Sequence, residues 1–329
     1  MNVLVVAMCD SVHTARWLGQ FVGTENTFTL YPSTPHRRLH PKIREELACP
    51  EGCLIRIRSV DRLLALPLGI VDTLLQNRVR AFILKRLISR GNFDMVHILE
   101  SQHAGYIYAK AVKTMQLRPP VALSIWGNDL YWFGNSPKHK KNLRTLLSSV
   151  DLMFAECIRD QHLARDFGYH GVFAARIPAS GGVGRAVHLT EISHLPRTST
   201  RRGVVVKGYT GFRGRASLAL QAIVEKRHLL NDCDVSFYSA SWRVLILVRY
   251  FKLRYKLPLT AYRKKSLSHA AILELFQKAR ISLAVSMSDG FPGSAREAMW
   301  TGAFPIESVG SCVGEWLSDG TSCLLVHPS

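Results

Sequence analysis

Short apolar runs alternate with longer amphipathic stretches along most of the chain, and this alternation narrows the folds open to it. The apolar run at 3–8 precedes a helical pattern at 13–21. Helical stretches also separate the next apolar runs, at 93–99, 121–126, 151–155 and 171–174. Strands that alternate with helices usually form a parallel sheet covered by helices on both faces. We therefore expect an α/β fold.

The alternation stops at 178–200 and then starts again. This stretch is rich in Gly, Ser, Thr and Arg, as is typical of a connection. Beyond it we expect strands at 203–208, 233–240, 281–288, 303–308 and 323–327, and helices at 215–230, 270–280 and 294–300. A chain of 329 residues is long enough for two domains. We predict two Rossmann-like, doubly wound domains, residues 1–185 and 201–329, joined by a linker at 186–200.

Composition limits the classes of function without choosing one. Hydrophobic residues at 47% exclude a disordered chain. The chain has 43 Lys and Arg against 24 Asp and Glu, a net charge of +19, which favours an anionic partner: nucleic acid, acidic membrane or phosphorylated substrate. The apolar stretch at 63–75, broken by Pro67 and Asp72, is too short for a transmembrane helix. The N-terminal run indicates a buried strand rather than a signal peptide.

Two further stretches leave alternatives open. Residues 241–265 are strongly basic with interleaved aromatic residues. Three interpretations stay open. The segment is an amphipathic helix with a solvated basic face, or it attaches the protein to an anionic membrane surface. The third is a nucleic-acid-binding patch, although no recognition motif accompanies it. Of seven scattered cysteines only Cys49 and Cys53 lie close together. Reduced thiols in a cytoplasmic protein are a better reading than a zinc site there.

The stretch 286–308 contains the most informative motif. A strand pattern ends at a turn containing Gly290, and a helix pattern begins at about Ser294. The N-terminus of a helix binds anions because its first N–H groups are unpaired. Asp289 and Glu297, with seven residues between them, could bind hydroxyl groups on either side of a phosphate held there. The alternative is a capped helix start with a solvated Glu297.

This stretch resembles the E-x7-E region of retaining glycosyltransferases with the two-domain GT-B architecture, family 4 type (glycosyl transferases group 1). The matching residues are Gly290, Phe291, Pro292, Glu297, Ala298, Met299, Gly302 and Pro305. Asp289 stands where the family has its first Glu. The resemblance implies transfer of a sugar from a nucleotide-diphosphate sugar without a metal or cofactor. It places Glu297 on the ribose hydroxyls and Asp289, with the Gly290–Pro292 turn, against the donor sugar.

The family also holds the donor diphosphate with a pair of basic residues after the first strand of the second domain. Lys207 and Arg213 are the positions that match, and Arg215 is a substitute. Two cations and a helix N-terminus can neutralise a diphosphate leaving group. The alternative is a set of surface cations around a loop.

The resemblance also extends to the first domain, at residues that in the family face the interdomain cleft. His13 lies at the first strand-to-helix turn, where Asp10 or Ser11 could instead cap the helix. His97 lies within a strand pattern and is expected to be structural, whereas His103 follows in a loop and is a candidate catalytic residue.

The stretch 124–130 resembles the family's H-G-x-D loop, with Trp126 in place of the His. Asp129 matches and is a candidate for contact with the acceptor, or else caps a turn. The resemblance extends over nearly the whole chain but ends before the family's terminal helices, so we expect these to be missing here.

The resemblance does not identify the acceptor. A saccharide or lipid-linked acceptor in cell-surface polysaccharide or lipopolysaccharide synthesis fits the family, and the basic charge favours a cytoplasmic protein at the inner membrane surface. The alternatives are a nucleotide-sugar epimerase or a phosphorylase of the same architecture, a non-catalytic polyanion-binding protein, and an inactive family member.

Overall fold

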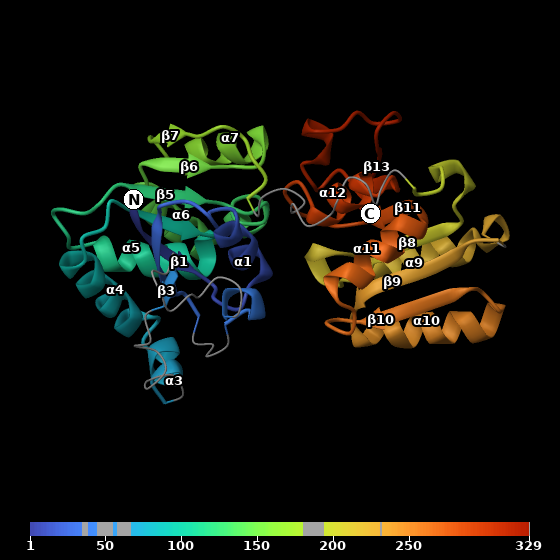
Figure 1. Ribbon diagram of the computed structural model, residues 1–329, viewed down its shortest axis with the longest axis horizontal. Coiled ribbons are helices and arrows are strands. Elements are labelled where there is room, and N and C mark those ends of the chain that lie inside the picture. The colour runs from blue at the N-terminus through green and yellow to red at the C-terminus, as the bar shows by residue number, and fades with distance from the viewer. Residues whose placement is uncertain (35–38, 45–54, 58–66, 180–193, 231, 329) are drawn as a thin grey trace. The chain divides into compact units, whose positions relative to one another are not determined.

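The computed structural model describes residues 1–34, 39–44, 55–57, 67–179, 194–230 and 232–328. The chain divides into two compact units, Met1–Gly181 and Gly182–Ser329. Each unit is a sheet with helices on its faces (Figure 1). The boundary between the units, most of the predicted linker, Cys49 and Cys53 lie outside the described residues.

Unit 1 contains a seven-stranded sheet in the order β3-β2-β1-β4-β5-β6-β7, in which every strand pair is parallel. Its strands are β1 (Asn2–Ala7), β2 (Thr27–Pro32), β3 (Ile55–Ile57), β4 (Met95–Leu99), β5 (Val121–Ser124), β6 (Leu152–Phe154) and β7 (Val172–Phe173). Its helices are α1 (Val12–Gly19), α3 (Pro67–Leu74), α4 (Arg78–Arg90), η2 (Ser101–Gly105), α5 (Tyr106–Val112), η3 (Phe133–Asn135), α6 (Pro137–Leu147) and α7 (Ile158–Asp166).

Both faces of this sheet are buried. Successive side chains of a strand point to opposite faces. Leu4 of β1 therefore joins a cluster that contains Leu84 of α4, and Val5 joins a second cluster with Leu18 of α1. This confirms the expected parallel sheet with helices on both faces.

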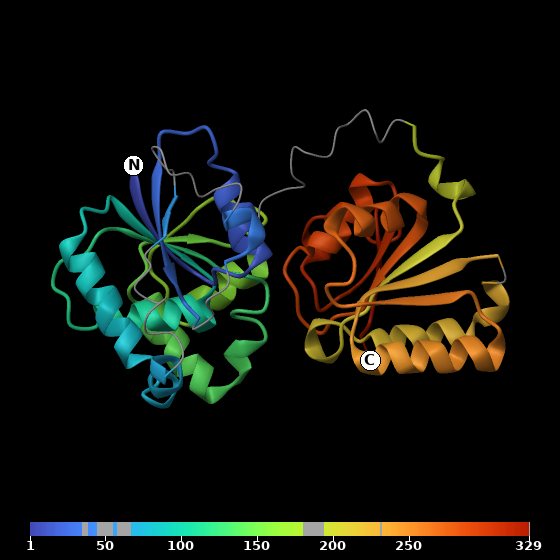
Figure 2. The ribbon, with the colours of Figure 1, turned by 60° about the horizontal axis from the view of Figure 1, so that its bottom comes forward.

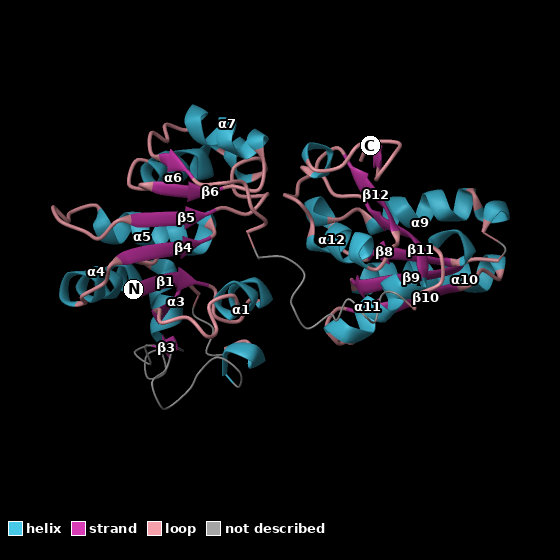
Figure 3. Cartoon of the chain, turned by 45° about the horizontal axis from the view of Figure 1, so that its top comes forward, coloured by secondary structure: helices cyan, strands magenta, loops and turns pink. Residues whose placement is uncertain are grey.

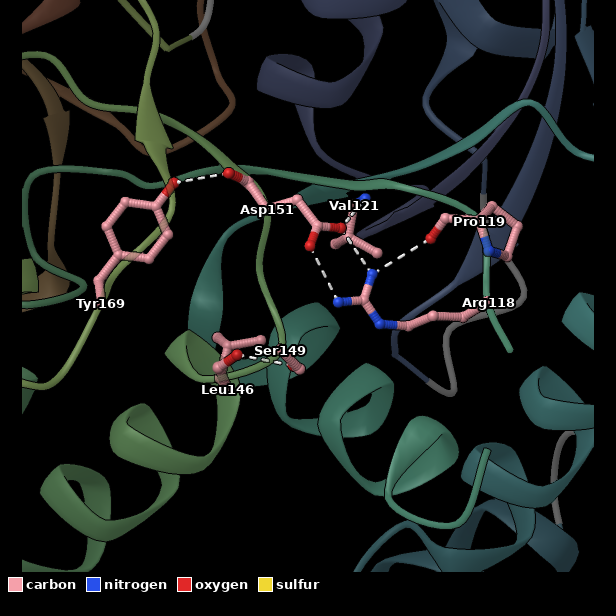
Figure 4. Close-up of polar contacts among 7 residues, drawn as sticks. All are labelled: Arg118, Pro119, Val121, Leu146, Ser149, Asp151 and Tyr169. Carbon is pink, nitrogen blue, oxygen red and sulfur yellow. Dashed lines mark hydrogen bonds and ion pairs between the residues drawn. The ribbon is translucent and has the colours of Figure 1, made fainter. Parts of the chain in front are cut away.

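An ion pair lies at the end of this sheet where β5 and β6 begin (Figure 4). The guanidinium of Arg118 donates to both oxygens of Asp151, at 2.6 and 3.1 Å, and the amide of Val121 donates to the same carboxylate. The Tyr169 hydroxyl donates to the Asp151 carbonyl oxygen. These contacts fix the strand starts, and they lie at the end of the sheet opposite to the strand C-termini.

Unit 2 contains a six-stranded parallel sheet in the order β10-β9-β8-β11-β12-β13 (Figure 3). Its strands are β8 (Gly203–Lys207), β9 (Asp234–Ala240), β10 (Leu259–Arg263), β11 (Ala279–Ala284), β12 (Phe304–Ser308) and β13 (Leu324–Val326). Its helices are η4 (Thr198–Thr200), η5 (Gly211–Arg213), α9 (Ala216–Glu225), η6 (Arg227–Leu229), α10 (Trp242–Tyr255), α11 (His269–Lys278), α12 (Gly293–Trp300) and η7 (Val313–Glu315). Counted within the unit, this is the 3-2-1-4-5-6 order of the Rossmann fold.

The helices of unit 2 cover the two faces of its sheet in pairs. Val206 of β8 packs with Leu220 of α9 and Val244 of α10, whereas Val205 packs with Phe276 of α11 and Ala298 of α12. Figure 2 shows α9 and α10 side by side beneath the sheet, with α10 on the outside. In the described parts of the chain, no helix is both long enough and apolar enough to cross a membrane.

Some elements differ from those predicted. The basic segment 241–265 is not one helix, because α10 ends at Tyr255 and β10 follows it as an edge strand. Strand β2 was not predicted, because Thr alternates with apolar residues in its first half and Pro32 ends it. The predicted strand at 281–288 begins at Ala279 and ends at Ala284. Residues 285–288 instead open the loop that leads to α12.

Candidate functional site

The strand order of unit 2 reverses between β8 and β11, which lie side by side. Helix α9 follows β8 onto one face of the sheet, and α12 follows β11 onto the other. In open α/β sheets, ligands bind at the carboxyl ends of the strands at such a point. The loops after β8 and β11 are therefore the part of unit 2 in which to look for a site.

Lys207, the last residue of β8, points to Asp289 in the loop after β11. The Lys207 Nζ lies 2.8 Å from the Asp289 Oδ2, and only 10% of the lysine side chain is exposed. Burial opposes the charge of this ammonium, but the nearby carboxylate of Asp289 outweighs it and raises the pKa of Lys207. Lys207 is therefore a cation fixed in a nearly dry position.

Glu307 of β12 is a third ionisable group of this cluster. Its side chain is fully buried, and among the described residues neither carboxylate oxygen has a hydrogen-bond partner. Burial, helped by the negative charge of Asp289 and opposed by Lys207, raises the pKa of Glu307 to about 8. At neutral pH Glu307 is therefore mostly a neutral acid behind the Lys207–Asp289 pair.

Backbone contacts hold the two loops together. The amide of Met287 donates to the Phe212 carbonyl oxygen at 2.8 Å, and the amide of Arg215 donates to the Val285 carbonyl oxygen at 2.6 Å. Gly208 lies so close to β9 that an added Cβ would stand 2.6 Å from the Tyr238 carbonyl oxygen. The loop after β8 therefore tolerates no side chain at its first position.

The two predicted arginines of this loop differ in their surroundings. Arg213, in η5, is exposed and lies with its guanidinium 5.2 Å from the centre of the Phe212 ring. Arg215 is the N-cap of α9, and its guanidinium donates to the Pro328 carbonyl oxygen. Arg213 is thus the more exposed of the two arginines, and Arg215 has a structural contact with Pro328.

Glu297 lies on α12 and contacts His269, the first residue of α11. The His269 Nε2 is 2.8 Å from the Glu297 Oε1. The glutamate side chain is 12% exposed and the histidine side chain 50% exposed. Glu297 is therefore held in place by a neighbouring helix and is not the solvated helix residue considered as its alternative.

The predicted motif around Gly290 forms the entry to α12. Pro292 is the N-cap, and the helix begins at Gly293, one residue before the position expected from the sequence. The Gly290 carbonyl oxygen accepts from the Cys312 amide, and the Phe291 ring stacks on Trp316 with centroids 5.2 Å apart. These contacts fix the turn that joins Asp289 to the N-terminus of α12, where the first N–H groups have no partner within the helix.

In unit 1 the strand order reverses between β1 and β4, and His13 and His103 follow these two strands. His13 is exposed at the start of α1, where Ser11 caps the helix by accepting from the His13 amide. The His13 ring packs against Trp126, with centroids 5.1 Å apart. The structure therefore brings two separately predicted stretches, around His13 and around Trp126, into contact.

His103 and Asp129 have different environments. His103 is exposed, and its amide donates to the carboxylate of Glu100. Asp129 is 2% exposed and accepts from the amides of Ser101 and Trp126. This geometry is that of the turn-capping alternative considered for Asp129. His97 is buried against Ser124, as expected for a structural residue, and burial lowers its pKa to about 3.

Glu100 was missed by the sequence analysis. It is 3% exposed, and its carboxylate accepts from three successive amides at the start of η2. Its backbone has φ 76° and ψ 155°, a region that is costly for any residue with a side chain. Burial, and then the charge of Asp129, raise the pKa of Glu100, and burial raises that of Asp129. These two carboxyl groups therefore favour a state that retains a proton.

Glu307 and His269 were also missed. A glutamate inside the apolar run 303–308 is a sequence signal for an unusual buried charge. His269 has no such signal, because its partner Glu297 lies 28 residues away.

Two Rossmann-like units in one chain are the architecture that GT-B folds share. Residues 59–156 match the family described as Glycosyl transferase 4-like. The GT-B fold and the resemblance inferred from the sequence are confirmed by this match and by the structural neighbours described next. No curated protein matches the chain.

Three solved structures illustrate the similarity of the whole chain. A trehalose-6-phosphate synthase, studied for glycosyltransfer with retention, has 13% identity and a TM-score of 0.67 over 99% of this chain and 87% of that one. Anabaena Alr3699/HepE in complex with UDP and glucose has 12% identity and a TM-score of 0.65 over 100% and 86%. The lipopolysaccharide outer core galactosyltransferase WaaB has 10% identity and a TM-score of 0.64 over 100% and 87%. At such identities the similarity concerns the fold.

Proposed function

We propose that this protein is a retaining glycosyltransferase that moves a sugar from a nucleotide-diphosphate sugar to a saccharide or lipid-linked acceptor. The observation that carries the proposal is the Lys207–Asp289 pair, 2.8 Å apart at the point where the strand order of unit 2 reverses. A buried cation, a helix N-terminus and a carboxylate meet there, and this is the chemistry that a sugar diphosphate requires.

In this proposal unit 2 binds the donor. Lys207 and the first amides of α12 bind the diphosphate, and the exposed Arg213 adds a second cation. Glu297, oriented by His269, accepts hydrogen bonds from the ribose hydroxyls. Asp289, beside the Gly290–Pro292 turn, accepts from a hydroxyl of the donor sugar. The HepE complex with UDP and glucose makes UDP the first nucleotide to test.

The same groups promote the reaction. Negative charge grows on the diphosphate as the bond to the sugar breaks, so fixed cations at that position lower the barrier. This charge stabilisation supports a reaction that needs no metal ion or other cofactor. Retention of configuration is proposed from the resemblance of the motif and from the retaining trehalose-6-phosphate synthase.

Unit 1 then supplies the acceptor side. His13 and His103 are the exposed candidates at the strand ends of this unit, and Asp129 with Glu100 shapes the backbone beneath them. The lipopolysaccharide galactosyltransferase among the neighbours supports an acceptor from cell-surface polysaccharide or lipopolysaccharide synthesis. A cytoplasmic protein peripheral to a membrane would meet such an acceptor.

The test is release of nucleoside diphosphate from a panel of sugar donors, with and without saccharide acceptors, after treatment with EDTA. We expect one donor to be consumed faster with an acceptor, and the anomeric configuration of the product, read by NMR, to equal that of the donor. Asp289→Asn should slow release strongly while Lys264→Met, an exposed lysine of the same unit, should not. Donor conversion to another free nucleotide sugar would instead identify an epimerase.

A further inference from the structure

Helix α10 has an exposed apolar stripe on the side turned away from its own unit. Trp242, Ile246, Tyr250 and Leu253 are 65%, 59%, 56% and 72% exposed. They are spaced by four, four and three residues, so they lie on one face of the helix. Single exposed apolar side chains are common, but a row of them along a whole helix marks a surface that a protein partner or a membrane covers.

The stripe is not a leftover of core packing. Val244 and Val248 of the same helix are buried and belong to the core cluster of unit 2. At 3.6 residues per turn, these two valines lie on the side of α10 opposite to Trp242 and Ile246. Helix α10 therefore has two apolar faces, of which the fold uses one.

Basic side chains border the stripe on both sides. Arg243 and Arg254 lie along one border, Arg249 and Lys252 lie along the other, and Lys256 is the C-cap of the helix; all five are exposed. The chain contains no Asp or Glu between Asp234 and Glu274. We define the α10 face as these five cations together with the four apolar residues of the stripe.

We propose that the α10 face docks on an anionic membrane surface, with the helix axis in the plane of the interface. An apolar stripe rich in aromatic residues and bordered by Lys and Arg is the pattern of helices that lie at the headgroup level. With 14 residues the helix is about 21 Å long, too short to span the bilayer. Charge complementarity selects the anionic lipid, because a second α10 face would bring ten cations together.

This inference deepens the acceptor part of the proposed function and rests on that part. Docking through the α10 face would hold unit 2 at the membrane surface, where a lipid-linked acceptor lies. Membrane binding itself needs neither donor nor acceptor. The failure of one proposal is therefore distinguishable from the failure of the other.

The experiment is flotation of the full chain with vesicles of phosphatidylcholine containing about one third phosphatidylglycerol, and with phosphatidylcholine alone. We expect binding to the anionic vesicles only. Arg249→Glu with Lys252→Glu should weaken it by about tenfold or more, since each cation near an anionic surface adds measurably to the affinity. Trp242→Ser with Leu253→Ser should weaken it as well, also at high salt, where charge is screened.

Matched controls come from exposed residues elsewhere. Leu229→Ser, at a position 68% exposed in unit 2, and Arg90→Glu with Lys113→Glu, on unit 1, should leave vesicle binding unchanged. Circular dichroism spectra and melting temperatures should be the same in all variants, which shows that they fold. Binding that ignores anionic lipid, that survives both α10 variants, or that is replaced by salt-sensitive binding of α10 to RNA would overturn the inference.

Discussion

The Lys207 Nζ lies 2.8 Å from the Asp289 Oδ2, so an ion pair joins the end of β8 to the loop after β11. The fully buried Glu307 lies near this pair, and in the described parts of the chain neither of its oxygens has a hydrogen-bond partner. Three ionisable groups thus share one position at the strand ends. A diphosphate would compete with two carboxyl groups for the positive charge of Lys207. The competition would be stronger when Glu307 is ionised than when it is protonated.

We predict that Glu307→Gln removes a pH dependence from donor binding. With the pKa of Glu307 raised to about 8, the side chain of the folded protein is neutral at pH 7 and charged at pH 9. The affinity of the wild type for UDP should therefore fall between about pH 7 and pH 9, whereas Glu307→Gln should keep its affinity. Isothermal titration calorimetry at the two pH values measures this. Parallel pH profiles for both proteins would contradict it.

The same variant should change the pH dependence of stability. A carboxyl group whose pKa is raised on folding binds its proton more tightly in the folded state, so its contribution is full below the unfolded pKa of about 4.5 and is lost as pH rises through about 8. Urea unfolding should show Glu307→Gln gaining stability relative to the wild type as pH rises from 5 to about 8. A constant difference between the two proteins over this range would show that Glu307 is already ionised at low pH.

His269 is predicted to act through Glu297. Removing it in His269→Ala should weaken UDP binding by about three- to tenfold. This is less than the loss of a direct hydrogen bond to a charged group, about 1.5–3 kcal/mol, because His269 acts on the nucleotide only through Glu297. For 2′-deoxy-UDP or 3′-deoxy-UDP the loss should be much smaller, since the ribose contact of Glu297 is already reduced. His269→Gln, which keeps a donor, should recover part of the affinity. Equal losses for UDP and for both deoxy analogues would place the histidine elsewhere.

The Glu100–Asp129 pair of unit 1 is expected to make the fold sensitive to high pH. Burial raises the pKa of both groups, so the stability that they contribute is present at low pH and is lost as pH rises through the raised values. Asp129→Asn keeps an oxygen that can accept from Ser101 and Trp126 but removes one charge. Between about pH 6 and pH 9 the variant should therefore lose less stability than the wild type in urea unfolding. A variant that loses more would mean that the carboxylate is ionised and needed.

Gly208→Ala tests the close approach of the loop after β8 to β9. The added Cβ would stand 2.6 Å from a backbone oxygen, so we expect a loss of about 1–3 kcal/mol in the free energy of unfolding and weaker UDP binding. Gly19→Ala is the control, because among the described residues an added Cβ there meets nothing within 4 Å beyond its chain neighbours and its own helix backbone. The control should be neutral or slightly stabilising. Equal stability of Gly208→Ala and the wild type would mean that the loop can move away.

Much of unit 2 and its candidate site follows from local sequence patterns. The strand before Lys207, the turn at Gly290 and the helix that carries Glu297 each depend on residues close together in the chain. The fold brings Lys207 to Asp289 across 82 positions, and the sequence could pair them only through the order of the strands. Glu307 shows the limit, because a buried, unpartnered carboxyl group is defined by neighbours from other strands.

The missed elements have similar reasons. β10 follows α10 inside one continuous basic segment, and its strand pattern was hidden because edge strands carry exposed polar residues such as Thr260 and Arg263. In unit 1, Glu100 owes its role to a backbone conformation that no residue pattern indicates. His13 and Trp126 were singled out from two separate stretches of the sequence. The contact between their rings could be seen only in the folded structure.

The most direct test of the central claim is calorimetric titration of the wild type and of Lys207→Met with UDP, GDP, ADP and dTDP. Lys207→Arg keeps the charge, Lys264→Met is the matched control, and circular dichroism checks that each variant folds. We predict that one diphosphate binds the wild type and the control equally, that Lys207→Met loses at least about tenfold in affinity, and that Lys207→Arg loses less. Binding of a diphosphate with the same affinity to Lys207→Met, or no binding of any diphosphate to the wild type, would contradict a donor site at the end of β8.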